Sequence, residues 1–242
     1  MESMSYILFV CIAVPVGLML LPIERKSRKV VLALLMGMFC CLFVSEVNGL
    51  LLRLTKSTTL YFTTNVTPIT EEIVKILPVS YYAVVFMDKK KAITRENRIS
   101  IVTIAFAIGV GFAMLENVII LIRHINTVNM LFAIIRGFST GVMHSICTCL
   151  IANFIPYIYT NKKLYYCGTL CTFNLAVVFH SVFNLLVEAD SGIANNVGYM
   201  LPIIVYLILN LFVLKSFSSY RKRKCPSKAE ASADNNSDSS HA

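Results

Sequence analysis

Charged residues are scarce in this sequence. Asp, Glu, Lys and Arg make up 14% of its 242 residues, whereas hydrophobic residues make up 57%. Soluble chains carry about 25% charged residues, and the mean hydropathy of +0.71 is higher than the core of a soluble domain of this length can accommodate. The scarcity of charge therefore excludes an ordinary soluble protein and predicts a chain that lies mostly in lipid.

Long polar stretches are also missing. The longest is 221–242, which is rich in Ser, Ala, Asn and Lys and predicts a disordered cytoplasmic tail. No internal repeat is visible, and we expect residues 1–220 to form a single transmembrane domain. The first apolar run lacks a preceding basic segment and a small-residue cleavage site, so we expect a retained span rather than a signal peptide.

Apolar runs of about 20 residues, enough to cross roughly 30 Å of hydrocarbon, recur along the chain. The seven runs are 5–21, 30–52, 68–88, 99–122, 130–157, 164–187 and 198–218. In lipid every backbone polar group has to be satisfied inside the span, which an α-helix achieves. We therefore predict an all-α fold, a polytopic membrane helical bundle of about seven transmembrane helices.

Most of the 22 Lys and Arg residues lie in alternate connections between these runs and near the end of the chain. The basic segments are 25–29, 89–98, 162–163 and 215–228. Because cytoplasmic loops are enriched in Lys and Arg, this placement predicts an outside N-terminus and a cytoplasmic C-terminus. The net charge of +9 then follows from topology, and we expect no nucleic-acid partner.

Several ionisable side chains fall inside the predicted spans, where each costs a few kcal/mol on the mildest insertion scales. They are accompanied by two amides, and the set is Glu71, Glu72, Lys75, Glu116, Asn117, Arg136, His144, His180 and Asn184. Such residues normally face the interior of a bundle and have partners there. We expect them to do so here.

The depth of each group follows from the rise of about 1.5 Å per residue in a helix and from the alternating direction of the spans. The expected depths below the outer boundary are about 5 Å for Glu71 and Glu72, about 10 Å for Glu116 and His180, and about 15 to 20 Å for His144. Four consecutive spans thus carry polar groups in the outer half of the membrane. This pattern predicts one cavity.

Spacing within the helices adds neighbours to the histidines. Asn184 lies one turn from His180 and can bond to the imidazole, a peptide group or a water beside it. Arg136 lies two turns from His144, where it can pair with a carboxylate or polarise a carbonyl.

Glutamates and histidines in a water-accessible pocket can hydrolyse peptide bonds. A carboxylate, here Glu71 or Glu72, can act as general base towards water. Two imidazoles and a carboxylate can also hold zinc with one position open, and His144, His180 and Glu116 are the candidate ligands. Without a metal, the same histidines can donate hydrogen bonds to a tetrahedral oxyanion.

Each residue also has an ordinary structural explanation. Thr67, Pro68 and the two acids that follow are typical of a helix start, where a cap and negative charge complement the helix dipole. A single histidine, or Arg136 near an interface, is equally explained by packing or snorkelling. The group as a whole is harder to explain in this way, because polar residues on four helices would have to coincide in depth by accident.

Small residues recur every four positions in two neighbouring spans. Ala105, Gly109 and Ala113 do so in the fourth, and Gly137 and Gly141 in the fifth. Small residues at this spacing let helix backbones approach closely, so we expect these two helices to pack tightly.

The polar residues occur in four short motifs. These are Glu71-Glu72-Ile73-Val74-Lys75, Gly111-Phe112-Ala113-Met114-Leu115-Glu116-Asn117, Arg136 followed by His144, and His180-Ser181-Val182-Phe183-Asn184. In this order they resemble the PrsW family of intramembrane metalloproteases, which shows an E-E-x-x-K motif, an F-x-x-x-E-N motif and two later histidines. The resemblance covers about 68–187, and the wider group includes the type II CAAX prenyl proteases and the scaffold subunit of γ-secretase.

The resemblance implies an intramembrane endopeptidase that makes the first cut in a single-span membrane protein such as a bacterial anti-sigma factor. The cofactor expected from the candidate ligands is zinc, with a metal-free site as the alternative. It also implies a multi-pass protein of the bacterial plasma membrane that acts in the response to envelope stress. The expected catalytic residues are Glu71, Glu72, Glu116, His144 and His180, and the residues expected around them are Lys75, Asn117, Arg136 and Asn184.

Three alternatives remain open. A CAAX-type prenyl endopeptidase would have arginine after the glutamate pair and histidine at position 116, so Lys75 and Glu116 argue against it. A silent membrane scaffold keeps intramembrane histidines for structure, whereas the paired acids favour an enzyme. A transporter also uses buried Glu and His as proton relays, but the matching halves of a repeat-built transporter are not visible.

Overall fold

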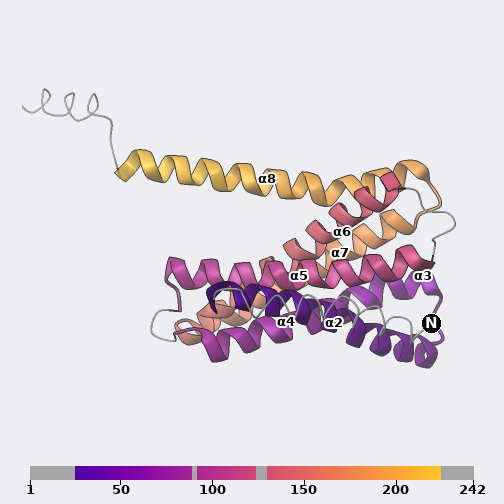
Figure 1. The fold of residues 1–242 in the computed structure, drawn as a ribbon, viewed down its shortest axis with the longest axis horizontal. Helices are drawn as coiled ribbons and strands as arrows, with labels where there is room; N and C mark the ends of the chain where they lie inside the picture. Colours follow the sequence, from indigo (N-terminus) through magenta and orange to yellow (C-terminus); the bar gives the residue numbers. More distant parts are fainter. Residues whose placement is uncertain (1–24, 89–91, 124–129, 225–242) are drawn as a thin grey trace, which may run out of the picture. The chain divides into compact units, whose positions relative to one another are not determined.

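The computed structural model describes residues 25–88, 92–123 and 130–224, and the regular structure in these ranges is entirely helical (Figure 1). The helices are α2 (Arg25–Thr55), α3 (Thr59–Tyr61), the π-helical turn η1 (Phe62–Val66), α4 (Thr67–Phe86), α5 (Arg95–Arg123), α6 (Met130–Ala152), the 3-10 turn η3 (Ile155–Tyr159), α7 (Lys162–Glu188) and α8 (Gly192–Lys224). The prediction of an all-α fold is confirmed for these residues. The first predicted span, 5–21, and the tail beyond residue 224 lie outside them.

Five of the described helical segments are long and apolar enough to cross a membrane. They are Ser27–Thr55, Arg95–Arg123, Met130–Tyr159, Lys162–Glu188 and Gly192–Leu209. The predicted third span corresponds to α4, which has 20 residues but carries Glu71, Glu72 and Lys75 and is not among the five. The total of seven spans and their orientation stay predictions.

Helix α4 can carry these charges because other helices surround it. It contacts α2, α5, α6 and α7, while α2 packs along α5, α5 against α6, and α6 against α7 (Figure 1). A helix packed on several sides by protein does not need an apolar surface all round. The charged face of α4 is therefore turned towards the other helices instead of lipid.

Backbone-to-backbone contact holds α2 close to α5. A Cβ added at Gly37 would collide with the carbonyl of Ile108, and one added at Gly111 would collide with the carbonyl of Leu34. Only glycine leaves enough room for helices this close.

The expected close approach of α5 to α6 is present, but only some of the small residues make it. A Cβ at Gly109 would lie 2.6 Å from Cα of Ser145 in α6. At Gly137 and Gly141 an added Cβ would meet no described atom within 4 Å, so the prediction that these two glycines form the contact is wrong. Their spacing matches the motif, but no described atom packs against the position of their missing Cβ.

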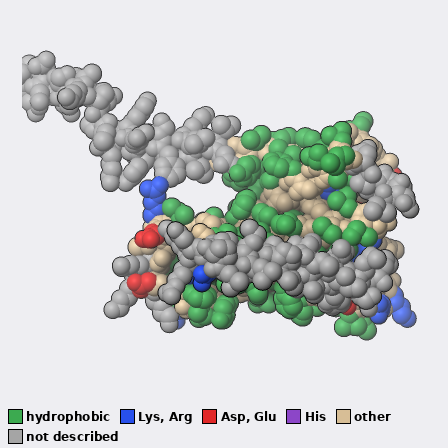
Figure 2. Space-filling model, in the orientation of Figure 1, with side chains coloured by type: hydrophobic (Ala, Val, Ile, Leu, Met, Phe, Trp, Pro, Cys, Tyr) green, Lys and Arg blue, Asp and Glu red, His purple; other side chains and the backbone are tan. Residues whose placement is uncertain are grey.

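Burial is the reverse of that in a soluble protein. Hydrophobic side chains cover much of the described surface (Figure 2), and exposed ones include Phe39, Phe43 and Val178. Charged side chains such as Lys75 are buried inside. The chain is therefore arranged as expected for helices in lipid.

The chain divides into two compact units, Met1–Ile203 and Ile204–Ala242. The first contains α2 to α7 and the beginning of α8, and all the residues discussed below belong to it. The described part of the second, 204–224, is helical. The predicted single domain over 1–220 stays a prediction.

One end of the first unit is rich in basic residues. Lys29 at the start of α2 lies over the rings of Tyr82 and Phe86 near the end of α4, with its Nζ 5.7 and 5.0 Å from their centroids. The hydroxyl of Tyr159, in η3 after α6, donates to the carbonyl of Ala83 in the same part of α4. We call this the basic end, and the end at which α4 and α6 begin the opposite end.

Candidate active site

Helix α4 supplies two glutamates near the opposite end of the bundle. Glu71 is 6% exposed and Glu72 is fully buried. The turn η1 runs directly into α4, and no side chain caps its start, so the glutamates do not lie at a free helix terminus. Both glutamates are buried, and helical structure continues on the N-terminal side of α4 as η1. These two facts disfavour the explanation that the glutamates only complement a helix dipole.

A continuous chain of polar contacts links five side chains from four helices. Oε1 of Glu72 lies 2.7 Å from Nζ of Lys75 and 2.9 Å from Nδ1 of His180. Nζ of Lys75 lies 2.8 Å from Nδ1 of His144, whose Nε2 lies 2.9 Å from Oε2 of Glu116. The chain therefore runs His180–Glu72–Lys75–His144–Glu116 through α7, α4, α6 and α5.

The direction of these hydrogen bonds follows from what each group can donate. An ammonium group has no acceptor, so Lys75 donates to both Glu72 and Nδ1 of His144. The His144 proton then lies on Nε2 and is donated to Glu116. A carboxylate only accepts, so His180 donates from Nδ1 to Glu72, and in the neutral imidazole Nε2 then carries a lone pair.

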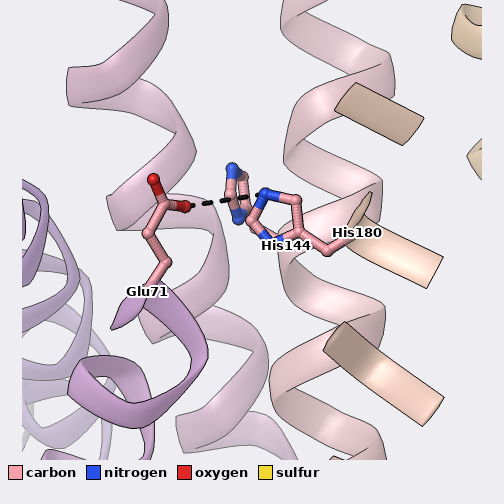
Figure 3. Close-up of side chains that lie close together, drawn as sticks. All are labelled: Glu71, His144 and His180. Carbon is pink, nitrogen blue, oxygen red and sulfur yellow. Dashed lines mark ion pairs between the residues drawn. The ribbon is translucent and has the colours of Figure 1, made fainter. Parts of the chain in front are cut away.

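That lone pair faces a second carboxylate. Nε2 of His180 is 3.6 Å from Oε2 of Glu71, which is buried and has no hydrogen-bond partner among the described residues. Glu71, His144 and His180 each offer a ligand atom within 4.8 Å of the others (Figure 3). The two imidazole rings meet edge to face, with centroids 4.9 Å apart.

Phe112 of α5 closes the cluster on one side. Its ring centroid is 4.8 Å from that of His144 and 4.8 Å from Nζ of Lys75. A cation over an aromatic face is stabilised by the ring quadrupole, most strongly away from water. Phe112 belongs to a motif recognised in the sequence, but its contacts could not be predicted because they depend on how α4 and α6 face α5.

A cavity of about 520 Å³ reaches this cluster through Glu116. Its lining residues come from η1 and α4 to α8, and they are Thr63, Thr67, Glu116, Ile120, Arg123, Phe132, Arg136, Phe183, Asn184, Val187, Glu188 and Tyr199. The side chain of Glu116 is 27% exposed, in contrast to the buried Glu71 and Glu72. Glu116 is thus the carboxylate of the cluster that faces the cavity.

The predicted amide companions have different positions. Asn184 lines the cavity and donates to the peptide carbonyl of Thr63 at 3.0 Å, one of the partners expected for it. Asn117 donates to the hydroxyl of Thr140 and thereby joins α5 to α6. Neither amide has a hydrogen bond to an imidazole in the described part of the chain.

Tyr199 is a cavity residue that the sequence did not single out. Its hydroxyl accepts from Nη1 of Arg136 at 3.4 Å, and its carbonyl accepts from the hydroxyl of Ser139 at 2.7 Å. A tyrosine near the end of a predicted span is also typical of a membrane interface, so the sequence carries no signal that separates the two roles.

The fold and the site together define a helical membrane protein with a buried centre of glutamates and histidines beside a cavity. The family profile described as PrsW family intramembrane metalloprotease matches residues 25–214. The chain belongs to this family, and it is therefore a hydrolase that acts in a lipid bilayer on a membrane protein. The prediction from the four motifs is confirmed, and this finding disfavours the scaffold and the transporter. Searches of curated proteins and of solved structures gave no match.

The family implies a metal, and the cluster fits one. One carboxylate and two imidazoles form a ligand set known from catalytic zinc sites with an open position. Oε2 of Glu71 has no hydrogen-bond partner among the described residues and is available to an ion. The hydrogen bond from Nδ1 of His180 to Glu72 directs the other ring nitrogen, Nε2, towards the same place. Both nitrogens of His144 are engaged, so binding an ion there would replace its contact with Lys75 or with Glu116.

The two carboxylates meet the histidines in different ways. Glu71 offers a ligand atom to both His144 and His180, whereas Glu116, which the sequence hypothesis places beside the two histidines, accepts a hydrogen bond from Nε2 of His144. The assignment of Glu116 as a metal ligand stays a prediction.

Proposed function

We propose that this protein is an endopeptidase that cleaves a single-span membrane protein with water activated by a glutamate. The contact chain from His180 to Glu116 supports the proposal, because it assembles carboxylates and imidazoles from four helices within an apolar bundle and ends at a cavity. Ionisable groups at this depth are retained for function rather than stability.

Glu71, His144 and His180 would hold the metal, and zinc suits this ligand set. When bound in such a site, zinc activates water and polarises the scissile carbonyl. Glu72 holds His180 in the tautomer that leaves Nε2 available, in the manner of a carboxylate behind a ligating imidazole. Lys75 neutralises Glu72 and orients the ring of His144.

Glu116 is the best-placed general base. It lines the cavity through which water and a peptide would arrive, and its Oε2 accepts a hydrogen bond from Nε2 of His144. A base has to lie within hydrogen-bond reach of the water it deprotonates. The sequence hypothesis, with Glu71 or Glu72 as the base and Glu116 as a metal ligand, is the alternative to be tested.

The substrate would meet the site near the outer face of the membrane. The cavity lies towards the opposite end of the bundle, away from the basic end, and the positive-inside rule makes the basic end cytoplasmic. Cleavage near the outer face suits the first cut in an anti-sigma factor during envelope stress, in a bacterial plasma membrane.

Proteolysis by the purified protein tests the proposal. Wild-type protein in liposomes, with zinc and a tagged single-span substrate, should release a fragment, and Glu116→Gln and His180→Ala should lower its rate by at least about a hundredfold. The matched control is Val178→Ala, which truncates an exposed residue on the same helix and should leave the rate unchanged. Full cleavage by His180→Ala would reject the proposal.

A further inference from the structure

Arg136 of α6 lines the cavity and forms no ion pair with a carboxylate among the described residues. It is 8% exposed, and its Nε is buried with no hydrogen-bond partner among the described residues. Its one hydrogen bond in this part of the chain is the 3.4 Å contact from Nη1 to the hydroxyl of Tyr199. A buried guanidinium normally pairs with a carboxylate, because leaving its charge uncompensated is costly.

The two glutamates that line the same cavity are already engaged. Oε2 of Glu116 accepts from His144, and Oε2 of Glu188 accepts from the hydroxyl of Thr63 at 2.6 Å. Neither forms an ion pair with Arg136 within the described residues. The guanidinium therefore keeps unused donors in a cavity that also contains Glu116.

The surroundings of Arg136 form a defined pocket. The rings of Phe132 and Phe183 lie edge to face with that of Tyr199, at centroid distances of 5.8 and 6.3 Å. The hydroxyl of Ser139, three residues from Arg136, fixes the backbone of Tyr199. A cation set among aromatic walls binds an anion more strongly than it would in water.

We propose that Arg136 binds a carboxylate group of the substrate and so places an acidic residue of the cleaved protein in the cavity beside the scissile bond. A guanidinium presents two parallel N–H donors that match a carboxylate, and this geometry fixes orientation as well as charge. The inference rests on the proposed function. It names the class of substrate, which is a membrane protein with a carboxylate group near the cut. This carboxylate belongs either to an Asp or Glu side chain or to the C-terminus of the substrate.

Peptide binding tests the inference without requiring cleavage. The probe is a fluorescent single-span peptide with a Leu- and Ala-rich core and a Gly–Ser flank that carries one Glu, at a different position in each member of a set. The matched peptides carry Gln. The full-length His180→Ala protein, in nanodiscs of phosphatidylcholine, should bind the best Glu peptide at least roughly tenfold more tightly than its Gln partner.

Variants assign that preference to one side chain. Arg136→Gln, made in the His180→Ala protein, should bring the Glu and Gln affinities to within about twofold of each other, and Arg136→Lys should keep part of the difference. The matched control, Arg123→Gln, removes an exposed arginine from the same cavity and should keep the full difference. A Glu preference that survives Arg136→Gln would overturn the inference, as would equal binding of Glu and Gln peptides to the parent protein.

Two further measurements separate the sources of the carboxylate and exclude a structural role. A peptide that ends within the flank with a free carboxylate, compared with its amide, reports chain-end recognition, and the internal Glu reports a side chain. In protein that retains His180, Arg136→Gln should raise KM for the Glu peptide by a larger factor than KM for the Gln peptide. An equal fall in kcat/KM for the Glu and Gln peptides would mean that Arg136 only supports the fold. Absence of cleavage by wild type would count against the proposed function and leave the binding result to decide this inference.

Discussion

Nζ of Lys75 lies 2.8 Å from Nδ1 of His144, so a fully buried ammonium group joins the two histidines of the site through Glu72. Lys75 is among the largest fully buried side chains of the described residues. The lysine and the carboxylate compensate each other in a place where either charge alone would be costly. Lys75 therefore sets both the charge balance of the cluster and the orientation of His144.

Substituting Lys75→Met should destabilise the protein and inactivate it. The change keeps an unbranched side chain of similar length but leaves Glu72 buried without its counter-charge, which costs about 3 to 5 kcal/mol. The double variant Glu72→Gln, Lys75→Met should recover at least about half of this loss, because no net charge remains buried. Unfolding in an SDS titration gives the free energies, and a Lys75→Met variant as stable as wild type would contradict the role given to the pair.

Metal content distinguishes the two assignments of the glutamates. Metal analysis of purified protein should find zinc in wild type and in Glu116→Gln, and much less in Glu71→Gln and in the double variant of His144 and His180 to Ala. Glu116→Gln should nevertheless lose at least about a hundredfold in cleavage rate, as expected for a general base. The opposite pattern would restore Glu116 as a ligand, and equal zinc in all variants would favour glutamate-activated water without zinc.

The membership of this site could be predicted from the sequence, because charged residues in apolar helices have to face inward. The structure brings Glu71, Glu116, His144 and His180 from four helices into one cluster, and their depths in the membrane stay predictions. Which carboxylate meets which imidazole could not be predicted, since it depends on how α4 and α5 are each rotated about their axes. Such rotations depend on contacts along the whole helix.

The helix contacts show the same limit. The sequence predicted 68–88 as a span like the other apolar runs, but α4 is not among the five segments apolar enough to cross a membrane, and it carries Glu71, Glu72 and Lys75. A spacing of small residues indicates that helices can approach, but Gly137 and Gly141 match that spacing, and a Cβ added at either would meet no atom of another described helix within 4 Å. The partner of a glycine is a property of the packed bundle, which local sequence does not contain.

Glycine substitutions should separate real helix contacts from matching spacing. Gly111→Ala places a methyl group against the backbone of Leu34, so we expect a loss of about 1 to 3 kcal/mol from overpacking. Gly137→Ala is the matched control, since its methyl group meets no described atom within 4 Å and alanine favours the helix. Its stability should equal or exceed that of wild type in the same SDS titration. A larger loss for Gly137→Ala than for Gly111→Ala would contradict the packing of α2 on α5.

Cysteine labelling in intact cells should determine which face of the membrane the cavity opens to. Gly192→Cys lies at the opposite end of the bundle in open space, and Lys162→Cys lies at the start of α7, in a basic connection. In a background without the native cysteines, an impermeant maleimide should label Gly192→Cys in intact cells and Lys162→Cys only after permeabilisation, because the positive-inside rule puts basic connections in the cytoplasm. The reverse pattern would place the cavity on the cytoplasmic side and exclude cleavage near the outer face, while leaving the chemistry of the site unchanged.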